Sequence, residues 1–330
     1  MCDDCSCSSV DKRIQTFDDQ KCKKCGEASV IKVHQQGGHC VECFLIHCRH
    51  KFAASIGKAN DVKYKSKVAV GYNAGSSSTA LLHLLSTMLS RIGKRKKLEF
   101  ICHFVYICFE DLDENSQTIE SLQSNVTSLG FTFSCIQPIA TFHYNRYLKR
   151  EIMLKTLCNF AASGNFDYCM IGWTSNSIAI NGLSDVITGR GDGFGFTAKF
   201  NDNKLFPILK PLKDFTDKEI GLYNYFSKTP APIYSLLNDS ISTYAVTENF
   251  VRGLQSGYIS TLSNIVNIGS KHSSSVNQNK CEVCSIPMPN HVNDSNTDKL
   301  TARSFLDHFD KPKYLKTLCY ACNLQNFENG

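Results

Sequence analysis

The sequence contains no apolar run near the roughly 18 residues that a membrane-spanning helix needs. Its first residues, from Met1 to Cys5, also lack the basic start and the apolar core of a secretory signal. These absences argue against a membrane protein, and we expect the chain to work in the cytoplasm without membrane contact. With 330 residues, of which 42% are hydrophobic, the chain can bury a sizeable core in about two domains.

Cysteine, in contrast, is abundant, with 17 in the chain. In a reducing compartment this number indicates metal binding rather than disulfides. Two arrays of C-x2-C pairs each offer four thiolates for a closed zinc site. The first array has 14 residues between its pairs. The second has 34, which is longer than a compact site needs, and we expect 287–298 to loop out. We therefore expect two structural zinc ions. The predicted ligands are Cys22, Cys25, Cys40 and Cys43 in the first site, and Cys281, Cys284, Cys319 and Cys322 in the second.

Other residues near these arrays are weaker ligand candidates. His39 and His47 lie close to the first array, but four cysteines already close that site, so solvated or packed histidines are favoured. Cys2, Cys5 and Cys7 stand in a polar stretch with little to bury, for which we expect a mobile tail.

The middle of the chain is organised around a short apolar strand, 67–71, a turn of small residues and an apolar-periodic helix. Small side chains let a phosphate approach the backbone, and a helix N-terminus attracts anions. The turn resembles the pyrophosphatase loop of adenylating tRNA-modification enzymes, Ser-Gly-Gly-x-Asp-Ser. Its residues here are Asn73, Ala74, Gly75, Ser76, Ser77 and Ser78. One glycine and the acidic residue of that pattern are missing, which makes the loop a poor candidate for ATP binding. An ordinary serine-rich turn is the alternative.

A second turn, 172–179, has lost acidic residues in the same way. In the enzymes that the first loop resembles, this place looks like Gly-His-Asn-x-Asp-Asp-x-Ala. This chain has Asn176 and Ser177 at the two acidic positions. Loss of both acidic sites favours loss of catalysis, and we expect no catalytic residues. The alternative is a simple strand-to-helix turn that buries Trp173.

Strands and helices alternate from residue 67 to residue 172, which predicts an α/β fold with a doubly wound parallel sheet. The segment 205–212 is predicted to be an edge strand because its prolines cannot donate to a central ladder. We interpret 189–195 as a flexible, partly basic loop. The expected divisions are a tail (1–20), a zinc module with a helix (21–60), the α/β domain (61–270), and a linker with a second zinc module (271–330).

The formal net charge is only +6, but basic residues gather near the loop. We predict an RNA-binding rim from these residues, while a solvated surface loop is an equal alternative on charge alone. The candidates are Lys94, Arg95, Lys96 and Lys97.

Several motifs occur together in one order along the chain. They are the first cysteine array, Arg49-His50-Lys51-Phe52, the loop at 73–78, Lys210-Pro211-Leu212-Lys213-Asp214 before Lys218-Glu219-Ile220, and Leu318-Cys319-Tyr320-Ala321-Cys322. Over about residues 20 to 325 the chain resembles the cytoplasmic tRNA 2-thiolation protein 2 family, degenerate homologues of the pyrophosphatase-loop (adenine nucleotide alpha-hydrolase-like) enzymes.

This resemblance implies a non-catalytic subunit of a cytosolic complex that 2-thiolates the wobble uridine (mcm5s2U) of tRNA Lys, Glu and Gln. A homologous catalytic subunit would adenylate the uridine and take sulfur from a thiocarboxylated ubiquitin-like carrier. Active relatives also carry a cysteine pair after the third strand, where this chain offers only Cys158, which we expect to be a core residue. The alternative is a self-sufficient ATP-dependent tRNA thiolase or adenylating ligase.

Overall fold

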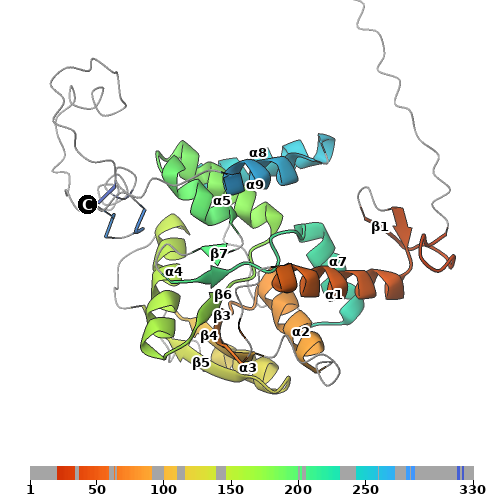
Figure 1. Ribbon diagram of the computed structural model, residues 1–330, viewed down its shortest axis with the longest axis horizontal. Coiled ribbons are helices and arrows are strands. Elements are labelled where there is room, and N and C mark those ends of the chain that lie inside the picture. Colours follow the sequence, from red (N-terminus) through yellow and green to blue (C-terminus); the bar gives the residue numbers. More distant parts are fainter. Residues whose placement is uncertain are drawn as a thin grey trace, which may run out of the picture. The chain divides into compact units, whose positions relative to one another are not determined.

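The computed structural model describes residues 21–33, 37–58, 63, 65–90, 100–109, 116–138, 146–199, 201–202, 206–230, 243–258, 260–271, 280–282, 284–286, 318–319 and 322. The chain divides into two compact units, residues 1–47 and 48–330. Figure 1 shows the labelled helices and strands of the described residues. Among the described residues, no helix combines the length and the apolar character that crossing a membrane requires. The four-part division expected from the sequence stays a prediction.

The first unit contains a small antiparallel hairpin, followed by the beginning of a long helix. Strand β1 (Ile31–Val33) pairs with β2 (Gly37–His39), and α1 (Val41–Lys58) begins one residue after Cys40. Glu42 lies in the first turn of α1, where a negative charge favours the helix dipole. The hairpin returns the chain so that the second cysteine pair, at the start of α1, lies next to the first pair.

The second unit is built on a six-stranded sheet, and the predicted parallel, doubly wound sheet is confirmed. The strands are β3 (Lys67–Gly71), β4 (Ile101–Ile107), β5 (Thr132–Ile136), β6 (Tyr168–Met170), β7 (Asn201–Asp202) and β8 (Ile208–Leu209). Their order is β5-β4-β3-β6-β8-β7, and all neighbours are parallel except the pair β7 and β8. Val68, Ala69 and Val70 are fully buried, as expected for a central strand covered on both faces.

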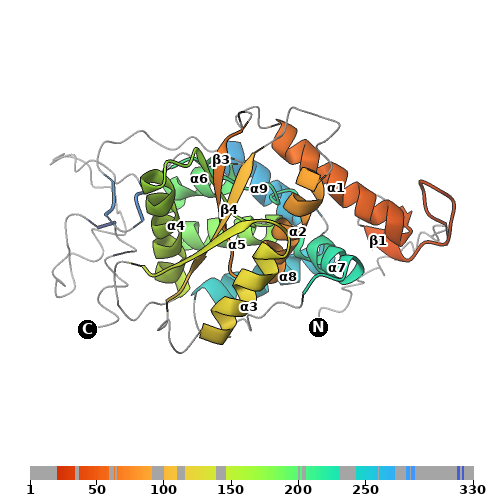
Figure 2. The same ribbon diagram turned by 90° about the horizontal axis from the view of Figure 1, so that it is seen from below.

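Helices that connect the parallel strands cover both faces of this sheet (Figure 2). They are α2 (Ser76–Ser90), α3 (Ser116–Thr127) and α4 (Arg146–Ser163). Right-handed crossovers place α2 and α3 on one face, whereas α4 returns the chain along the other face. Leu157 and Ala161 of α4 pack in one cluster with Ala69 of β3 and Cys169 of β6. The strand ends next to α2 therefore form the edge at which a nucleotide loop is expected.

Four further helices and a short 3-10 helix pack on one another as a separate layer. They are α5 (Ser175–Ile187), η2 (Gly191–Gly193), α6 (Phe194–Ala198), α8 (Thr243–Gly257) and α9 (Thr261–Lys271). Helix α7 (Asp217–Ser227) packs against α2 instead. The predicted capping box at the start of α7 is present, with Thr216 and Glu219 bonded reciprocally.

Two glycines inside helices of this layer make room for one aromatic ring. A Cβ atom on Gly182 of α5 would lie 2.1 Å from the ring of Phe194, and one on Gly269 of α9 would lie 2.5 Å from it. Phe194 is thus held between α5 and α9, and it fixes the start of α6. The interpretation of 189–195 as a flexible, partly basic loop is wrong in this respect, because Arg190 and residues 193–195 are buried.

The prediction of an edge strand at 205–212 is also wrong. Within the described part of this segment, 206–212, only Ile208 and Leu209 belong to a strand, and this strand, β8, lies inside the sheet between β6 and β7. The prolines do not prevent this position because Pro207 and Pro211 flank the two paired residues. Pro207 even contributes its carbonyl, which accepts a hydrogen bond from the Cys169 backbone N–H at 2.8 Å.

Candidate metal centres and the loop after the first sheet strand

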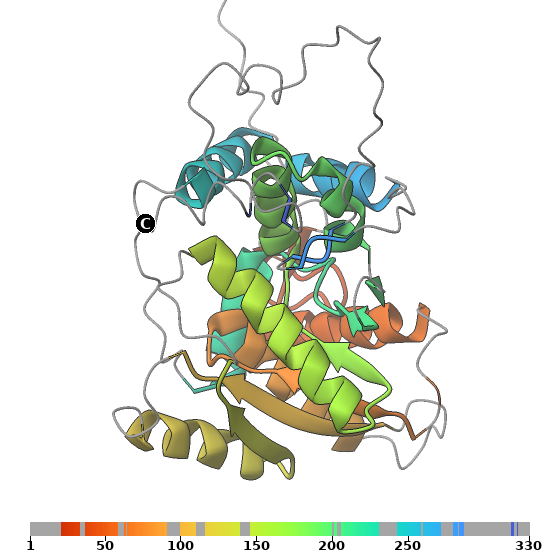
Figure 3. The same ribbon diagram turned by 90° about the vertical axis from the view of Figure 1, so that its left-hand side faces the viewer.

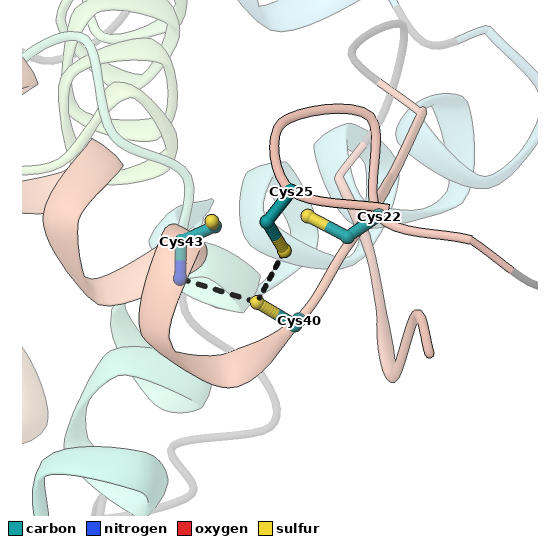
Figure 4. A group of neighbouring side chains, drawn as sticks. All are labelled: Cys22, Cys25, Cys40 and Cys43. Carbon is teal, nitrogen blue, oxygen red and sulfur yellow. Dashed lines mark hydrogen bonds between the residues drawn. The ribbon is translucent and has the colours of Figure 1, made fainter. Parts of the chain in front are cut away.

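The N-terminal cysteine site consists of Cys22, Cys25, Cys40 and Cys43 (Figure 4). Their sulfur atoms all lie within 4.8 Å of one another, and the Cys25 and Cys40 sulfurs are 3.5 Å apart. Sulfurs about 2.3 Å from a tetrahedral zinc ion would be about 3.8 Å apart, so small movements would suffice to bind one ion. The histidines His39 and His47 do not belong to this group of ligands.

The thiols of this site have pKa values that are shifted in opposite directions. The Cys40 backbone N–H is the largest influence on Cys22, and together with other backbone donors it lowers the pKa of this thiol to about 6. The hydrogen bond with the Cys40 side chain raises the pKa of Cys43 to about 12. Cys22 therefore favours the thiolate, while Cys25 and Cys43 favour the protonated thiol, and a bound cation would replace the protons on these two.

The C-terminal cysteine site consists of Cys281, Cys284, Cys319 and Cys322, and it forms despite the long gap between its two pairs. All four sulfurs lie within 4.8 Å of one another, and those of Cys284 and Cys319 are 3.6 Å apart. The first pair sits on a tight knuckle, in which the Ser285 N–H donates to the Cys281 carbonyl at 2.8 Å. Hydrogen bonds from the other three thiols lower the pKa of Cys281, and the bond with Cys284 has the largest effect. Hydrogen bonds with the same neighbours, first of all with Cys281, raise the pKa of Cys322.

Each cysteine site could hold a metal ion. Four thiols without an oxygen or nitrogen donor are soft ligands, and such a set is typical of zinc or of an iron-sulfur centre. Three of the four C-terminal cysteines are buried, so their sulfurs are protected from solvent. The sequence spacing predicted both ligand sets, and the structure brings each set together.

The loop at 73–78 follows β3, and hydrogen bonds between its own residues hold it together. The Asn73 Oδ1 atom accepts hydrogen bonds from the Gly75 N–H at 3.1 Å and from the Ser78 hydroxyl at 2.7 Å. Ala74 has a φ of 54°, in the left-handed region that favours glycine. The loop therefore keeps a glycine-like backbone at the position where the glycine is missing, at some cost in strain.

Neighbouring elements close around the start of α2. The Asn224 amide of α7 donates to the Ser76 carbonyl at 2.8 Å and to the Ser76 hydroxyl at 3.0 Å. A Cβ atom on Gly172, after β6, would lie 3.0 Å from the Ser77 carbonyl oxygen. Only a glycine permits this close approach of the two turns. The donors that a phosphate would use are thus partly engaged by Asn73, and the turn itself is tightly packed.

The second degenerate turn is a packing junction. Asn176 of α5 is 1% exposed, and its amide donates to the Gln255 side chain of α8 at 2.9 Å. Its Oδ1 atom accepts a hydrogen bond from the Asp217 backbone N–H at 3.0 Å. The amide that replaces an acidic residue thus ties α5 to α7 and α8.

Asp217 was not found by sequence reasoning as a residue of this region, because it appeared only as part of a capping box. Its carboxylate accepts a hydrogen bond from the Thr174 hydroxyl at 2.5 Å, and Arg252 approaches it at 3.5 Å. Burial raises the pKa of Asp217, while the Thr174 hydroxyl and Arg252 act in the opposite direction. Nothing local in the sequence pointed to this arrangement, because it depends on the packing of α7 and α8 against α5.

The other predicted site residues fall into two groups. Lys94, Arg95, Lys96 and Lys97 lie outside the described residues. Cys158 is 3% exposed in α4 and packs next to Cys169 in the core of the sheet, as expected for a core residue.

The chain matches no protein-family model. It is similar to proteins named "Cytoplasmic tRNA 2-thiolation protein 2". In the Danio rerio protein the identity is 24% over 336 residues, covering 76% of this chain and 67% of that protein. With the Drosophila willistoni protein the sequence identity is 24% over 332 residues, which cover 86% of this chain and 82% of that protein.

Among solved structures, the chain is similar to "U34-tRNA thiolase NcsA from Methanococcus maripaludis with its [4Fe-4S] cluster". The TM-score is 0.63 and the sequence identity 17%, covering 76% of this chain and 87% of that one. At this identity the likeness establishes a shared fold. The curated relatives in fish and insects carry one name, and the resemblance to the cytoplasmic tRNA 2-thiolation protein 2 family is confirmed.

Proposed function

We propose that this chain is a non-catalytic subunit of a cytoplasmic complex that 2-thiolates the wobble uridine of tRNA. A homologous catalytic subunit would activate the uridine C2 oxygen by adenylation and introduce sulfur delivered by a ubiquitin-like carrier. The names of the curated homologues and the fold shared with a tRNA thiolase support a role in tRNA thiolation. The role of a partner and of the carrier rests on the family resemblance.

The observation that carries the non-catalytic part is the hydrogen bonding of Asn73. Its side chain uses the Gly75 N–H and the Ser78 hydroxyl, groups that a phosphate would need at this loop. The acidic positions of the resembling enzymes hold Ser77, Asn176 and Ser177 here, and Asn176 is committed to α7 and α8. A carboxylate that binds a metal-nucleotide complex is difficult to replace with a hydroxyl or an amide.

We further propose that both cysteine sites hold zinc as structural ions. The pairs Cys22–Cys25 and Cys281–Cys284 sit on short knuckles, and each array provides four thiolates with no position left for water. Zinc in such a closed site contributes to folding rather than to chemistry. The residues of this chain would supply binding surface for tRNA and for the catalytic subunit.

Reconstitution with the catalytic homologue tests this function. Thiolation of tRNA should require both chains, the sulfur carrier and ATP, and omission of this chain should abolish it. The isolated chain should not convert ATP to AMP in the presence of tRNA. Thiolation by this chain alone would overturn the proposal in favour of a self-sufficient thiolase, and full activity of the homologue alone would exclude a required subunit.

A further inference from the structure

A turn of exposed lysines leads into β3, the central strand of the sheet. The Ser66 backbone N–H and the Ser66 hydroxyl both donate to the Lys63 carbonyl, at 3.2 Å and 2.8 Å. Ser66 is only 4% exposed, so its side chain faces the protein, whereas Lys63, Lys65 and Lys67 are exposed. One closed turn therefore presents three lysines to solvent within five positions of the chain.

This turn lies at the amino end of β3, at the opposite end of the strand from the loop at 73–78. Lys67 is the register partner of Ile101, the first residue of β4, and the Ile101 N–H donates to the Ser66 carbonyl at 2.9 Å. Helix α4, light green in Figure 3, packs across β3, β4 and β6 on one face of the sheet. The faces of these strands are thus covered, while their amino ends meet solvent at Lys67 and at Ile101, which is 57% exposed.

The backbone of the turn does not favour a lysine at its centre. Lys65 has a φ of 62°, in the left-handed region where a Cβ atom crowds the following carbonyl oxygen. Glycine or asparagine would adopt this conformation with less strain. Folding alone therefore gives no reason for a lysine at this position, and the charge of its side chain is the property that remains to be explained.

The carboxylate beside the turn holds the start of the strand. The Asp167 side chain accepts a hydrogen bond from the Lys67 backbone N–H at 2.8 Å. The Asp167 N–H in turn donates to the Lys67 carbonyl at 2.8 Å. These two bonds fix the backbone at Lys67 against the residue before β6, so the turn has a rigid base from which its lysine side chains extend.

We propose that the turn 63–67 is a contact surface for the phosphate backbone of tRNA. The inference rests on the proposed function, in which the complex acts on tRNA. Clustered ammonium groups bind phosphates as point charges, independently of base sequence. Because this surface lies at the amino edge of the sheet, it can hold tRNA whether or not the loop at 73–78 binds a nucleotide.

A matched pair of lysines tests the proposal in the full chain, assembled with its catalytic homologue. Lys65→Asn removes one charge and supplies a residue that tolerates the left-handed backbone. The control is Lys228→Asn, because Lys228 is also exposed and also has a positive φ, of 53°. Neither change should lower the midpoint of thermal unfolding. Only Lys65→Asn should weaken tRNA binding, by about 3- to 10-fold, and reduce the slope of log affinity against log salt by about one.

Two triple variants separate charge from shape. Changing Lys63, Lys65 and Lys67 together to glutamine should reduce the salt slope by about three, whereas changing all three to arginine should preserve it. The predicted RNA-binding residues at 94–97 stay unchanged in every variant.

Equal tRNA affinities of Lys65→Asn and Lys228→Asn would refute the assignment of this surface, and so would equal weakening by the glutamine and arginine triples. A weaker affinity for the sulfur carrier with unchanged tRNA affinity would refute it in favour of a protein partner. Failure of the unchanged complex to bind tRNA would instead contradict the proposed function, and the surface with it.

Discussion

The Asn73 side chain accepts a hydrogen bond from the Ser78 hydroxyl at 2.7 Å, across the mouth of the loop that follows β3. In the resembling enzymes this loop is expected to leave its N–H groups open to a phosphate. Here the same amide oxygen also takes the Gly75 N–H. The loop keeps its position at the carboxyl end of the sheet, while its hydrogen bonds are satisfied from within.

Ser77→Ala and Ser78→Ala should leave thiolation by the reconstituted pair within a few-fold of the unchanged complex. The reason is that neither hydroxyl can replace the missing carboxylate, so the loop has no catalytic group to lose. Ser78→Ala should still cost about 1 kcal/mol of stability, since it removes the hydrogen bond to Asn73. The matching serine changes in the partner's loop should abolish activity. Pyrophosphate release by the isolated chain that depends on Ser77 would sink the non-catalytic interpretation.

Ala74→Gly should stabilise the chain. Ala74 has a positive φ, which costs a residue with a Cβ atom about 1 kcal/mol, although glycine gains more freedom in the unfolded chain. We expect the free energy of unfolding in urea to rise by up to about 1 kcal/mol. The control is Ala80→Gly within α2, which should lower it by about 1 kcal/mol. Equal destabilisation by both changes would show that the backbone at Ala74 carries no strain.

Elemental analysis should find about two zinc ions per chain and no iron. Cys25→Ser should lose one ion and unfold the first site, because a structural zinc contributes on the order of 10 kcal/mol to a small module. Cys158→Ser, a change at a core cysteine outside both sites, should keep both ions. An iron-sulfur absorption spectrum, or an unchanged zinc content in Cys25→Ser, would contradict the assignment.

Charge reversal of Lys94, Arg95, Lys96 and Lys97 should weaken tRNA binding by the complex. Each lost phosphate contact should reduce affinity similarly across RNA sequences and should flatten the dependence of affinity on salt. Filter binding at two salt concentrations measures both effects. Reversal of Lys218 in α7 and Lys228 just after it controls for a change of charge at another surface. Unchanged affinity at both concentrations would mean that 94–97 is only a solvated surface.

His83 should make the chain less stable as pH falls toward 6. Burial, and to a smaller extent Arg49, lower the pKa of His83, whose ring lies 2.9 Å from the Tyr223 hydroxyl. The unfolded chain then binds a proton near pH 6.5 while the folded chain does not, so stability is lost as pH falls below 6.5. His83→Gln should reduce the difference in unfolding free energy between pH 7.5 and pH 6. An unchanged difference would exclude this coupling.

The sequence by itself determined the elements whose signals are local. The alternation of strands and helices predicted the parallel sheet, the pair Thr216 and Glu219 predicted the start of α7, and the cysteine spacing predicted both ligand sets. Each of these depends on residues close in sequence or on a fixed ligand chemistry. The absence of acidic residues at Ser77, Asn176 and Ser177 is a prediction from the motif patterns of the resembling enzymes.

Only the tertiary structure decided what the replaced residues do. Asn176 contacts Gln255 from 79 positions away along the chain, and Lys155 donates to the Glu282 carbonyl from 127 positions away. Such contacts depend on which helices pack together, and no local pattern encodes them. The same holds for β8, which lies inside the sheet because its prolines flank the ladder, a matter of register and not of composition. Burial of Arg190 and of residues 193–195 was missed for this reason: it depends on Asp185 and on the packing of Phe194 between Gly182 and Gly269, which only the fold brings together.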